Sequence, residues 1–422
     1  MSVQNQLVAV VGQGYVGLPV AMRAVEVGYR VVGLDVDERR ITSLRDGISY
    51  VDDIASDELA AALASGRYVA TADYAEATGF DIAVITVPTP LREGLPDLTF
   101  IEESAASLAA LLKPGATVIL ESTTYPGTTE ELLVPILERG SGLVAGTDFS
   151  VGYSPERIDP GNAVWGFRET PKVVSGIDAQ SLARVQQFYG DLVAQTVPVS
   201  GTKEAELTKL LENTFRHVNI ALVNELAIFG HQLGVNVWES IEAASTKPFG
   251  YMKFTPGPGV GGHCLPVDPS YLSWQVRRKL GQSFRFVELA NDINDHMPDY
   301  VSQRLMVLLN KQGKAVNGAR IVLVGLSYKR NTGDIRESPS LRLIEVLNEL
   351  GAKVVGVDDR VEDHRWPSGV ERASYCAQTI SRADAVVLIT DHDEFDLELL
   401  NTSTVPVLDT KNRAAGPNVE RL

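Results

Sequence analysis

A glycine-rich turn near the N-terminus constrains the fold more than any other feature of the sequence. The apolar run Leu7–Val11 is followed at once by Gly12-Gln13-Gly14-Tyr15-Val16-Gly17, and residues 18–27 then have a helical pattern. A second apolar run, residues 30–34, ends at Asp35. A strand, a glycine turn, a helix and a strand in this order predict the β-α-β unit of a dinucleotide-binding fold.

Strand and helix patterns continue to alternate along the chain. Further patterns of buried strands recur at residues 81–87, 117–120, 320–326, 353–358 and 383–390. This alternation is typical of parallel, doubly wound sheets. We therefore predict an α/β protein with two Rossmann-like doubly wound domains, residues 1–200 and 301–422, joined by a long central helix and a helical middle domain, residues 201–300.

A long segment without internal glycine or proline lies between the two alternating regions. Within residues 203–230, apolar side chains recur at three- and four-residue steps at Leu207, Leu210, Leu211, Phe215, Val218, Leu222 and Leu226. This spacing predicts an amphipathic helix about 42 Å long. Because it is longer than one domain needs, we expect it to join two domains and to offer an apolar face to the partner in a homodimer.

Composition and charge exclude several classes of protein. The 422-residue chain has a formal net charge of −16, whereas a nucleic-acid binder would have a basic surface. No apolar run reaches the roughly 18 residues of a membrane span, and the polar N-terminus does not have the pattern of a signal peptide. The two cysteines, Cys264 and Cys376, do not form a disulfide framework. We expect a protein of the reducing cytoplasm that binds neither nucleic acid nor membrane.

The glycine turn predicts a binding site for NAD. Gly12 permits the turn, Gly14 lets the backbone approach a pyrophosphate, and Gly17 allows close packing of the helix on the strand. Asp35, 18 positions after Gly17, can accept hydrogen bonds from both ribose hydroxyls and would repel the 2′-phosphate of NADP. The two arginines that follow Asp35 soften this preference. A Rossmann fold that has lost its ligand is the alternative.

The second chemical feature is a cysteine within a glycine- and proline-rich stretch, residues 247–269, which we expect to be a functional loop. Five glycines of this stretch precede Cys264. Such a loop exposes backbone N–H groups that favour a thiolate, and Asp268 can act as a base or orient a water. We therefore predict that Cys264 is a nucleophile, with a free core cysteine as the alternative. We expect no metal site, because only His263 accompanies this cysteine as a second ligand.

Seven short motifs are spread in order along the chain. They are Gly12–Gly17, Val87–Pro90, Ser122–Gly127, Ser154–Arg157, Glu206–Asn213, Gly261–Pro269 and Tyr328–Pro339. Together they resemble the nucleotide-sugar 6-dehydrogenases, a family that includes UDP-glucose, GDP-mannose and UDP-N-acetylhexosamine dehydrogenases. The resemblance covers essentially the whole chain. It implies a four-electron oxidation in which the C6 alcohol of a nucleotide sugar becomes a carboxylate and two NAD are consumed.

The resemblance also implies a covalent mechanism. Cys264 would add to the aldehyde formed in the first oxidation, and the second oxidation would convert the resulting thiohemiacetal to a thioester. Lys209 and Asn213 would stabilise the developing oxyanion, although the helical pattern alone favours an exposed face for both. The remaining implied catalytic residues are Asp268 and Thr124, which would organise a water, and Glu156, which would assist hydrolysis of the thioester.

The binding residues follow from the same resemblance. Those that would contact NAD are Gly12, Gly14, Tyr15, Val16, Gly17, Asp35, Arg40, Thr86, Thr89, Thr124 and Arg336. Those that would contact the nucleotide sugar are Glu156, Arg157, Lys209, Asn213, Arg216, Tyr251, Gly259, Gly261 and Lys329. Either Lys411 or Arg413 would accompany Lys329.

Three places in the sequence bear on which sugar is oxidised. Pro160 stands where the UDP-glucose group has a second Glu, and the segments around His217 and at residues 245–251 resemble the UDP-N-acetylglucosamine branch. That branch commonly has Asp in place of His217, so the role of this residue stays open. Phe249 and Tyr251 can flank an acetamido group or pack the loop. We favour a UDP-N-acetylhexosamine. The alternatives are UDP- or dTDP-glucose, a two-electron hydroxyacid-type dehydrogenase, and a non-catalytic NAD sensor.

Overall fold

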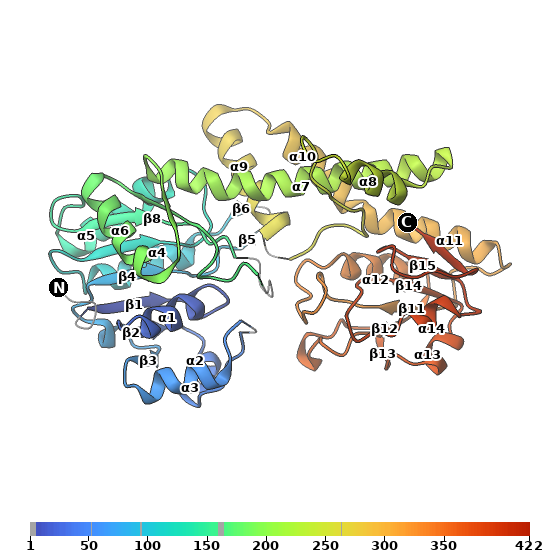
Figure 1. The fold of residues 1–422 in the computed structure, drawn as a ribbon, viewed down its shortest axis with the longest axis horizontal. Coiled ribbons are helices and arrows are strands. Elements are labelled where there is room, and N and C mark those ends of the chain that lie inside the picture. The colour runs from blue at the N-terminus through green and yellow to red at the C-terminus, as the bar shows by residue number, and fades with distance from the viewer. Residues whose placement is uncertain (1–5, 52, 93–94, 159–163, 263) are drawn as a thin grey trace. The chain divides into compact units, whose positions relative to one another are not determined.

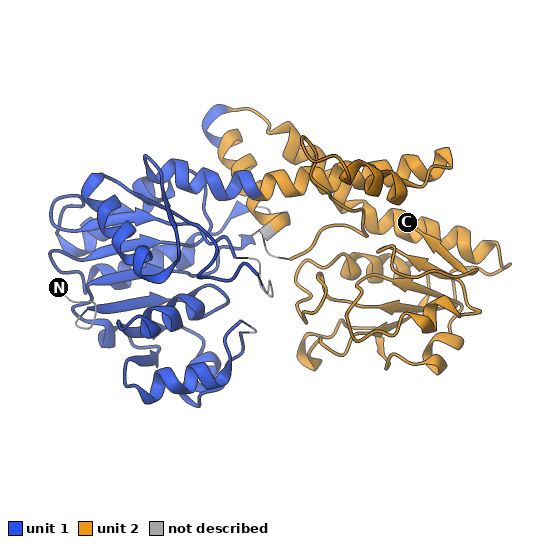
Figure 2. Ribbon diagram, viewed as in Figure 1, with its two compact units in different colours: residues 1–212, 278–280 blue, residues 213–277, 281–422 orange. Residues whose placement is uncertain are grey.

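The computed structural model describes residues 6–51, 53–92, 95–158, 164–262 and 264–422, with the backbone alone at Cys264 and Pro266. The chain divides into two compact units (Figure 2). Unit 1 comprises residues 1–212 and 278–280, and unit 2 comprises residues 213–277 and 281–422. Among the helices in the described part of the chain, none is both long and apolar enough to cross a membrane.

Unit 1 is built on an eight-stranded sheet with the strand order β10-β9-β8-β7-β4-β1-β2-β3 (Figure 1). Its strands are β1 (Leu7–Val11), β2 (Arg30–Leu34), β3 (Tyr68–Thr71), β4 (Ile82–Ile85), β7 (Thr117–Leu120), β8 (Ser150–Tyr153), β9 (Lys172–Gly176) and β10 (Thr196–Pro198). All neighbours pair in parallel except β8 and β9. The central strands are continuous apolar runs because both faces of a parallel sheet are covered.

Helices alternate with these strands and cover the sheet. They are α1 (Gly17–Glu26), α2 (Glu38–Arg45), α3 (Ser56–Ala64), η2 (Tyr74–Ala77), α4 (Thr99–Ala109), η3 (Thr129–Leu133), α5 (Val134–Ser141) and α6 (Ala179–Leu192). A hairpin of β5 (Leu91–Arg92) and β6 (Leu95–Pro96) lies outside the sheet. Leu18 of α1 and Phe188 of α6 are buried in one core cluster with Val8 of β1. The predicted first Rossmann fold is confirmed.

Unit 2 contains a second, all-parallel sheet of six strands in the order β13-β12-β11-β14-β15-β16. Its strands are β11 (Arg320–Val324), β12 (Lys353–Val357), β13 (Glu371–Arg372), β14 (Ala385–Leu388), β15 (Val407–Asp409) and β16 (Val419–Arg421). The second Rossmann-like fold is therefore also confirmed. In both sheets the strand order reverses beside the first strand, and doubly wound proteins bind ligands at the carboxyl ends of the strands there.

One helix of unit 2 begins inside a segment that the sequence pattern predicted as a loop. They are α8 (Val237–Ser245), α9 (Cys264–Leu280), α10 (Arg285–Asp295), α11 (Met297–Asn310), α12 (Pro339–Glu349), η4 (Asp363–Arg365), α13 (Ala377–Ser381) and α14 (Glu398–Asn401), and the last three residues of α9 belong to unit 1. The expected loop of residues 247–269 ends at α9, so Cys264 is the first residue of a helix. Pro266 lies in the first turn, where a missing N–H is harmless, although Pro269 lies inside the helix.

The long helix α7 (Thr202–Leu233) is confirmed, but its two faces differ from those of an ordinary amphipathic helix. The apolar side chains that are exposed along it are Leu207, Leu211, Phe215, Leu222, Leu226, Phe229 and Leu233. The side chains that it buries include Glu206, Lys209, His217 and Asn224. The expectation of an exposed Lys209 is therefore wrong. The face of α7 that packs against the protein mixes these polar side chains with apolar ones, Ala205, Leu210, Ala221, Val223 and Ala227, and an apolar stripe is left at the surface.

Candidate active site

The glycine turn between β1 and α1 has a conformation that requires glycine. Gly12 has a φ of 91°, and a Cβ atom there would lie 2.8 Å from the carbonyl oxygen of Thr86. A Cβ atom at Gly17 would lie 1.8 Å from the carbonyl oxygen of Gly12. The Thr86 hydroxyl donates to that same carbonyl at 2.8 Å, which ties the turn to the end of β4. The two glycines thus allow α1 to begin directly against the strand ends.

The turn has open space beside Gly14. Among the described residues, a Cβ atom at Gly14 would meet only Nη1 of Arg40, at 3.9 Å. Tyr15 is 39% exposed and Val16 is half-buried, and α1 begins at Gly17. The first N–H groups of a helix have no intrahelical acceptor and bind anionic groups well. The geometry therefore fits the pyrophosphate of NAD.

Asp35 follows β2 and connects its end to the glycine turn. Its Oδ2 accepts hydrogen bonds from the backbone N–H of Gln13 at 2.8 Å and from Arg40 at 3.2 Å. Its Oδ1 accepts from the N–H of Asp37 at 3.0 Å. A carboxylate has about four acceptor positions, so about one stays available for a ribose hydroxyl. Arg40 pairs with Asp35 and Arg39 pairs with Asp37, so both arginines are engaged by carboxylates, which favours NAD over NADP.

Gln13 is a residue of this turn that the sequence analysis missed. Its side chain is fully buried, donates to the carbonyl of Val10 at 2.9 Å, and accepts from the hydroxyl of Tyr68 at 2.8 Å. The Tyr50 hydroxyl donates to its main-chain carbonyl at 2.5 Å. Gln13 occupies a variable position of the glycine motif, and no local pattern identifies its partners.

Two threonines that are predicted to contact NAD are buried after neighbouring strands, Thr89 after β4 and Thr124 after β7. Within the described residues, the Thr124 hydroxyl has no hydrogen-bond partner, as expected for a group that binds a water or a ligand. Glu206 of α7 anchors the same segment: it accepts from the N–H groups of Gly127 at 2.5 Å and Thr129 at 2.8 Å. Burial raises the pKa of Glu206 to about 7, although the hydrogen bonds from these N–H donors favour the carboxylate and partly offset the rise.

Three buried side chains of unit 1, Lys172, Glu121 and Tyr189, form a polar cluster with Glu156. Lys172, the first residue of β9, contacts the carboxylate of Glu121 directly, and its Nζ lies 3.5 Å from Oε2 of Glu156. The hydroxyl of Tyr189 donates to Glu121 at 2.5 Å. The neighbouring strands β7, β8 and β9 bring Glu121, Glu156 and Lys172 together, and Tyr189 joins them from α6, although the four are far apart in the sequence. Sequence analysis identified Glu156 alone.

The cluster sets the ionisation of its two carboxyl groups. Burial raises the pKa of Glu121 to about 7, and Lys172 and Tyr189 oppose that shift. Burial also disfavours the charged form of Glu156, but the ammonium groups of Lys172 and Lys209 outweigh it and hold the pKa of Glu156 below its usual value. Glu156 is therefore a carboxylate at neutral pH.

Arg157 has local partners in unit 1. Its guanidinium pairs with Glu212 at 2.7 Å and donates to the carbonyl of Pro171 at 2.6 Å. These contacts tie the segment after β8 to α7 and to the residue before β9. The contact of Arg157 with substrate stays a prediction.

Unit 2 brings together two of the predicted catalytic residues. Asn213 of α7 donates from Nδ2 to Oδ2 of Asp268 at 2.6 Å. Asp268 is 1% exposed and lies four residues after Cys264 in α9, one helical turn further along. A carboxylate held by an amide thus lies one turn from the predicted nucleophile, at the N-terminal end of a helix.

The glycine segment before Cys264 packs closely on α7, on α10 and on the second Rossmann-like domain. The Gly257 N–H donates to the side chain of Asn224 at 2.9 Å, and the Gly262 N–H donates to the carbonyl of Arg336 at 3.0 Å. A Cβ atom at Gly259 would lie 3.1 Å from the carbonyl oxygen of Asn294. The guanidinium of Arg336 pairs with Asp334 at 2.6 Å, and both residues belong to unit 2.

The remaining predicted binding residues of unit 2 lie in different surroundings. Arg216 is exposed, Tyr251 is 38% exposed, and Phe249 is 70% exposed with Lys247 over its ring at 5.1 Å. Burial lowers the pKa of Lys411. Arg413 lies 3.4 Å from Asp391.

His217 is buried on α7. Its Nε2 lies 2.7 Å from the amide oxygen of Asn291, and burial lowers its pKa. These contacts give it a packing role within unit 2. Pro160, which bears on the choice of sugar, and His263 lie outside the described residues.

Three segments of the chain match the three domains of one family. Residues 6–193 match the NAD binding domain of the UDP-glucose/GDP-mannose dehydrogenase family, residues 203–296 match its central domain, and residues 322–415 match its UDP binding domain. The chain belongs to this family and is an NAD-dependent nucleotide-sugar dehydrogenase, an oxidoreductase. The resemblance seen in the sequence is thereby confirmed.

Several similar proteins are named for UDP-N-acetylhexosamines, and one similar solved structure, with a TM-score of 0.88 at 26% identity, is a UDP-glucose dehydrogenase from Pyrobaculum islandicum. The chain is 38% identical to the UDP-N-acetyl-D-glucosamine 6-dehydrogenase of Pseudomonas aeruginosa, over 92% of this chain and 91% of that protein. It is 36% identical to the UDP-N-acetyl-D-mannosamine dehydrogenase of Pyrococcus horikoshii, over 92% and 90% of the two chains. The solved structure of a UDP-D-ManNAc dehydrogenase from P. horikoshii superposes with a TM-score of 0.88 at 33% identity, and covers 99% of both chains.

Proposed function

We propose that this protein oxidises the C6 alcohol of a UDP-N-acetylhexosamine, with UDP-N-acetylglucosamine as the first candidate, to the uronic acid through a thioester at Cys264. The observation that carries the proposal is the Asn213–Asp268 hydrogen bond one helical turn from Cys264. It provides an amide and a carboxylate one turn along α9 from the only cysteine in the glycine-rich segment. The names of similar proteins favour an N-acetylhexosamine.

In the first oxidation the C6 alcohol loses a proton and a hydride and becomes an aldehyde. NAD held at the glycine turn would supply the hydride acceptor for this step, and a second NAD, after exchange of the NADH, would supply it for the later one. Lys209 and Asn213 stabilise the oxyanion that develops on the substrate oxygen, because a fixed ammonium and an amide donor favour negative charge there. Asp268 and Thr124 hold the water that takes up the proton. The Thr124 hydroxyl, which has no hydrogen-bond partner in the described part of the chain, supports that role.

The aldehyde then requires a nucleophile, because it has no alkoxide from which a hydride can leave. The Cys264 thiolate adds to its carbon and forms a thiohemiacetal, which loses a second hydride and becomes a thioester. The N–H groups in the first turn of α9 lack intrahelical acceptors and favour a thiolate at that helix end. Glu156 assists attack of water on the thioester, which releases the acid and restores the thiol. Its lowered pKa supports this role as a base.

Binding is divided among the predicted residues. NAD lies along the glycine turn, with Asp35 on a ribose and with Arg40, Thr86 and Thr89 nearby. The implied contacts with the sugar nucleotide stay proposals, and they comprise Glu156, Arg157, Lys209, Asn213, Arg216, Tyr251, Gly259, Gly261 and Lys329, with Lys411 or Arg413. The contact of Arg336 with NAD also stays a proposal.

The decisive experiment counts NADH formed per nucleotide sugar consumed. The four-electron reaction yields two NADH and a free carboxylic acid. One NADH with release of the aldehyde would instead support the two-electron alternative, and no NADH with any substrate would support the sensor. Running UDP-N-acetylglucosamine, UDP-N-acetylmannosamine, UDP-N-acetylgalactosamine, UDP-glucose and dTDP-glucose side by side identifies the sugar. A higher kcat/KM for either glucose nucleotide would overturn the N-acetylhexosamine assignment.

We also propose that the protein is a homodimer formed through α7. Seven apolar side chains are exposed along this helix, and a contiguous apolar stripe favours a self-complementary contact. Light scattering at micromolar concentration tests this: the wild-type chain should have twice the mass of a Leu222→Asp, Leu226→Asp variant. Val144→Asp, at an exposed apolar residue outside α7, is the matched control and should stay dimeric. Because a catalytic thiol must stay reduced, we place the enzyme in the cytoplasm.

A further inference from the structure

We propose that His392 is a positioning residue: it holds the turn of residues 327–331 in the conformation that presents Lys329 and supports the glycine segment before Cys264. The proposal rests on the proposed function, in which Lys329 binds the nucleotide sugar. His392 lies four residues after β14, where the strand order of the second sheet reverses. Ligands of doubly wound proteins bind at such points. In the first sheet the corresponding position is Thr89, four residues after β4.

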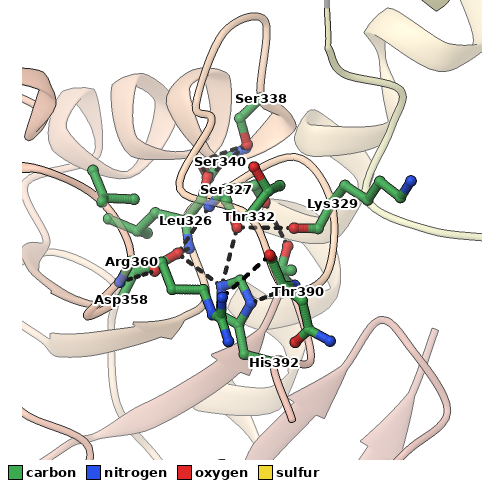
Figure 3. A network of polar contacts seen from close by, with 12 residues as sticks. Leu326, Ser327, Lys329, Thr332, Ser338, Ser340, Asp358, Arg360, Thr390 and His392 are labelled. Carbon is green, nitrogen blue, oxygen red and sulfur yellow. Dashed lines mark hydrogen bonds and ion pairs between the residues drawn. The ribbon is translucent and has the colours of Figure 1, made fainter. Parts of the chain in front are cut away.

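The contacts of His392 assign its tautomer. Its side chain is fully buried, and Nδ1 accepts the backbone N–H of Asn331 at 2.9 Å, so Nδ1 carries no proton. Nε2 therefore carries the proton and lies 3.1 Å from both Oδ2 of Asp358 and Oγ of Ser327 (Figure 3). One imidazole ring thus joins both ends of the turn to the end of β12.

Asp358 explains why this turn differs from the NAD turn of unit 1. It follows β12 as Asp35 follows β2, and its side chain is fully buried, whereas that of Asp35 is 5% exposed. Its Oδ1 accepts from the N–H of Arg360 at 3.1 Å. Its Oδ2 accepts from the N–H groups of Leu326 at 2.7 Å and Ser327 at 3.0 Å, and from His392. Burial opposes its ionisation, but these donors hold the pKa of Asp358 below its usual value. The carboxylate is therefore committed to the turn instead of to a ribose.

The turn is also attached at its carbonyl groups and presents one side chain outward. The Thr390 hydroxyl donates to the carbonyl of Ser327 at 2.6 Å, and the Ser327 hydroxyl donates to the carbonyl of Lys329 at 3.2 Å. In Figure 3 the side chain of Lys329 points away from this network. Asn331 has a φ of 61°, so the turn depends on its partners to hold an uncommon conformation.

Tyr328 transmits the position of the turn to the cysteine segment. A Cβ atom at Gly261 would lie 2.7 Å from Cβ of Tyr328, and one at Gly262 would lie 2.7 Å from its ring. The two glycines therefore pack directly on this side chain. A displacement of the turn would move Lys329 and would loosen the segment that leads to Cys264.

The test is His392→Gln, which removes the ring acceptor and retains an amide donor. We expect the dissociation constant for UDP, measured by calorimetry, and the KM for UDP-N-acetylglucosamine to rise about tenfold, the factor for one or two lost hydrogen bonds. The KM for NAD should change by less than about twofold, because the glycine turn of unit 1 is untouched. A general loss of structure would instead change both constants. His364→Gln, at an exposed histidine of the same domain, is the matched control and should change neither.

A second arm asks whether His392 acts through the turn. In a Lys329→Met background, His392→Gln should raise the dissociation constant for UDP by less than about twofold, because the group that it positions is already absent. The same rise in both backgrounds, or an equal rise in the KM for NAD, would overturn the proposal. If His392→Gln does not fold, Ser327→Ala removes one link and should raise the UDP dissociation constant about threefold; no change would overturn the proposal. If no nucleotide sugar is oxidised, the proposed function fails, whereas UDP binding still tests His392.

Discussion

Replacing Lys172 by Met isolates the role of the buried cluster around Glu156. The substitution removes the ammonium that contacts Glu121 and lies 3.5 Å from Glu156, and it leaves two carboxyl groups buried. At 3.5 Å and an effective dielectric constant of about 20, the lost attraction to Glu156 alone is about 5 kcal/mol. Removal of one partner from a buried ion pair typically destabilises a protein by about 3–5 kcal/mol. We expect a loss of that size at pH 8.

The loss should depend on pH in a known direction. Without Lys172, the pKa values of both carboxyl groups rise, and that of Glu121 is already raised to about 7 by burial. A carboxyl group whose folded pKa exceeds its unfolded value destabilises the fold fully above the folded pKa. This penalty declines as the pH falls through the folded pKa and is lost near the unfolded one. The variant should therefore recover up to about 3 kcal/mol between pH 8 and pH 6, since one pKa unit corresponds to about 1.4 kcal/mol.

Denaturant unfolding at pH 6 and pH 8 measures both effects. In thermal unfolding, a loss of 3–5 kcal/mol in a unit of this size should lower the Tm of the unit by about 6–20 °C. The matched control is Lys113→Met, because Lys113 pairs with Asp81 at 2.8 Å while 42% exposed, and an exposed pair contributes at most about 1 kcal/mol. Equal losses for Lys172→Met and Lys113→Met, or a Lys172→Met loss that is the same at both pH values, would refute the reasoning.

Three further predictions concern single groups. Cys264→Ser should form at most one NADH per substrate and no free acid, whereas Cys376→Ser should stay fully active; single-turnover absorbance distinguishes them. Asp35→Ala should raise the KM for NAD about tenfold or more, through loss of a charge-assisted hydrogen bond, and initial rates should show an unchanged KM for the sugar. Glu206→Gln should lower stability by about 1–3 kcal/mol, because the NH2 group of the new amide would face a backbone N–H donor that a carboxylate oxygen accepts in the wild type. Since the pKa of Glu206 is raised to about 7, the wild type should gain stability from pH 8 to pH 6 in urea titrations; an equal gain in Glu206→Gln would contradict this.

The chemistry of the NAD turn could be predicted from the sequence because its requirements are local. Gly12 and Gly17 are needed by the backbone of one turn, and Asp35 ends the next strand of the same β-α-β unit. The partners of Gln13 could not be predicted, because Tyr50 and Tyr68 reach it from elsewhere in the sequence. Similarly, the helix that begins at Cys264 was not predicted, because the glycines and prolines around it are typical of a loop.

The long helix α7 shows where the periodicity of a sequence misleads. Its leucines recur at helical spacing, and that pattern predicted both the helix and an apolar face. Which face packs against the protein depends on what lies opposite, and here Glu206 meets backbone N–H groups of the segment after β7 while Leu222 and Leu226 are exposed. A hydrophobic period identifies a face but not its partner.

The sequence by itself determined the two Rossmann-like domains, the NAD turn, the long helix and the identity of the predicted nucleophile, because strand patterns, glycine turns and motifs are properties of short segments. Only the tertiary structure decided that Lys172 and Glu121 surround Glu156, that Asn213 holds Asp268, and that His392 joins Asp358 to the turn beside Lys329. These contacts join residues that lie far apart in the chain. They form because the order of strands in a sheet and the burial of charge are decided by packing, which no short segment encodes.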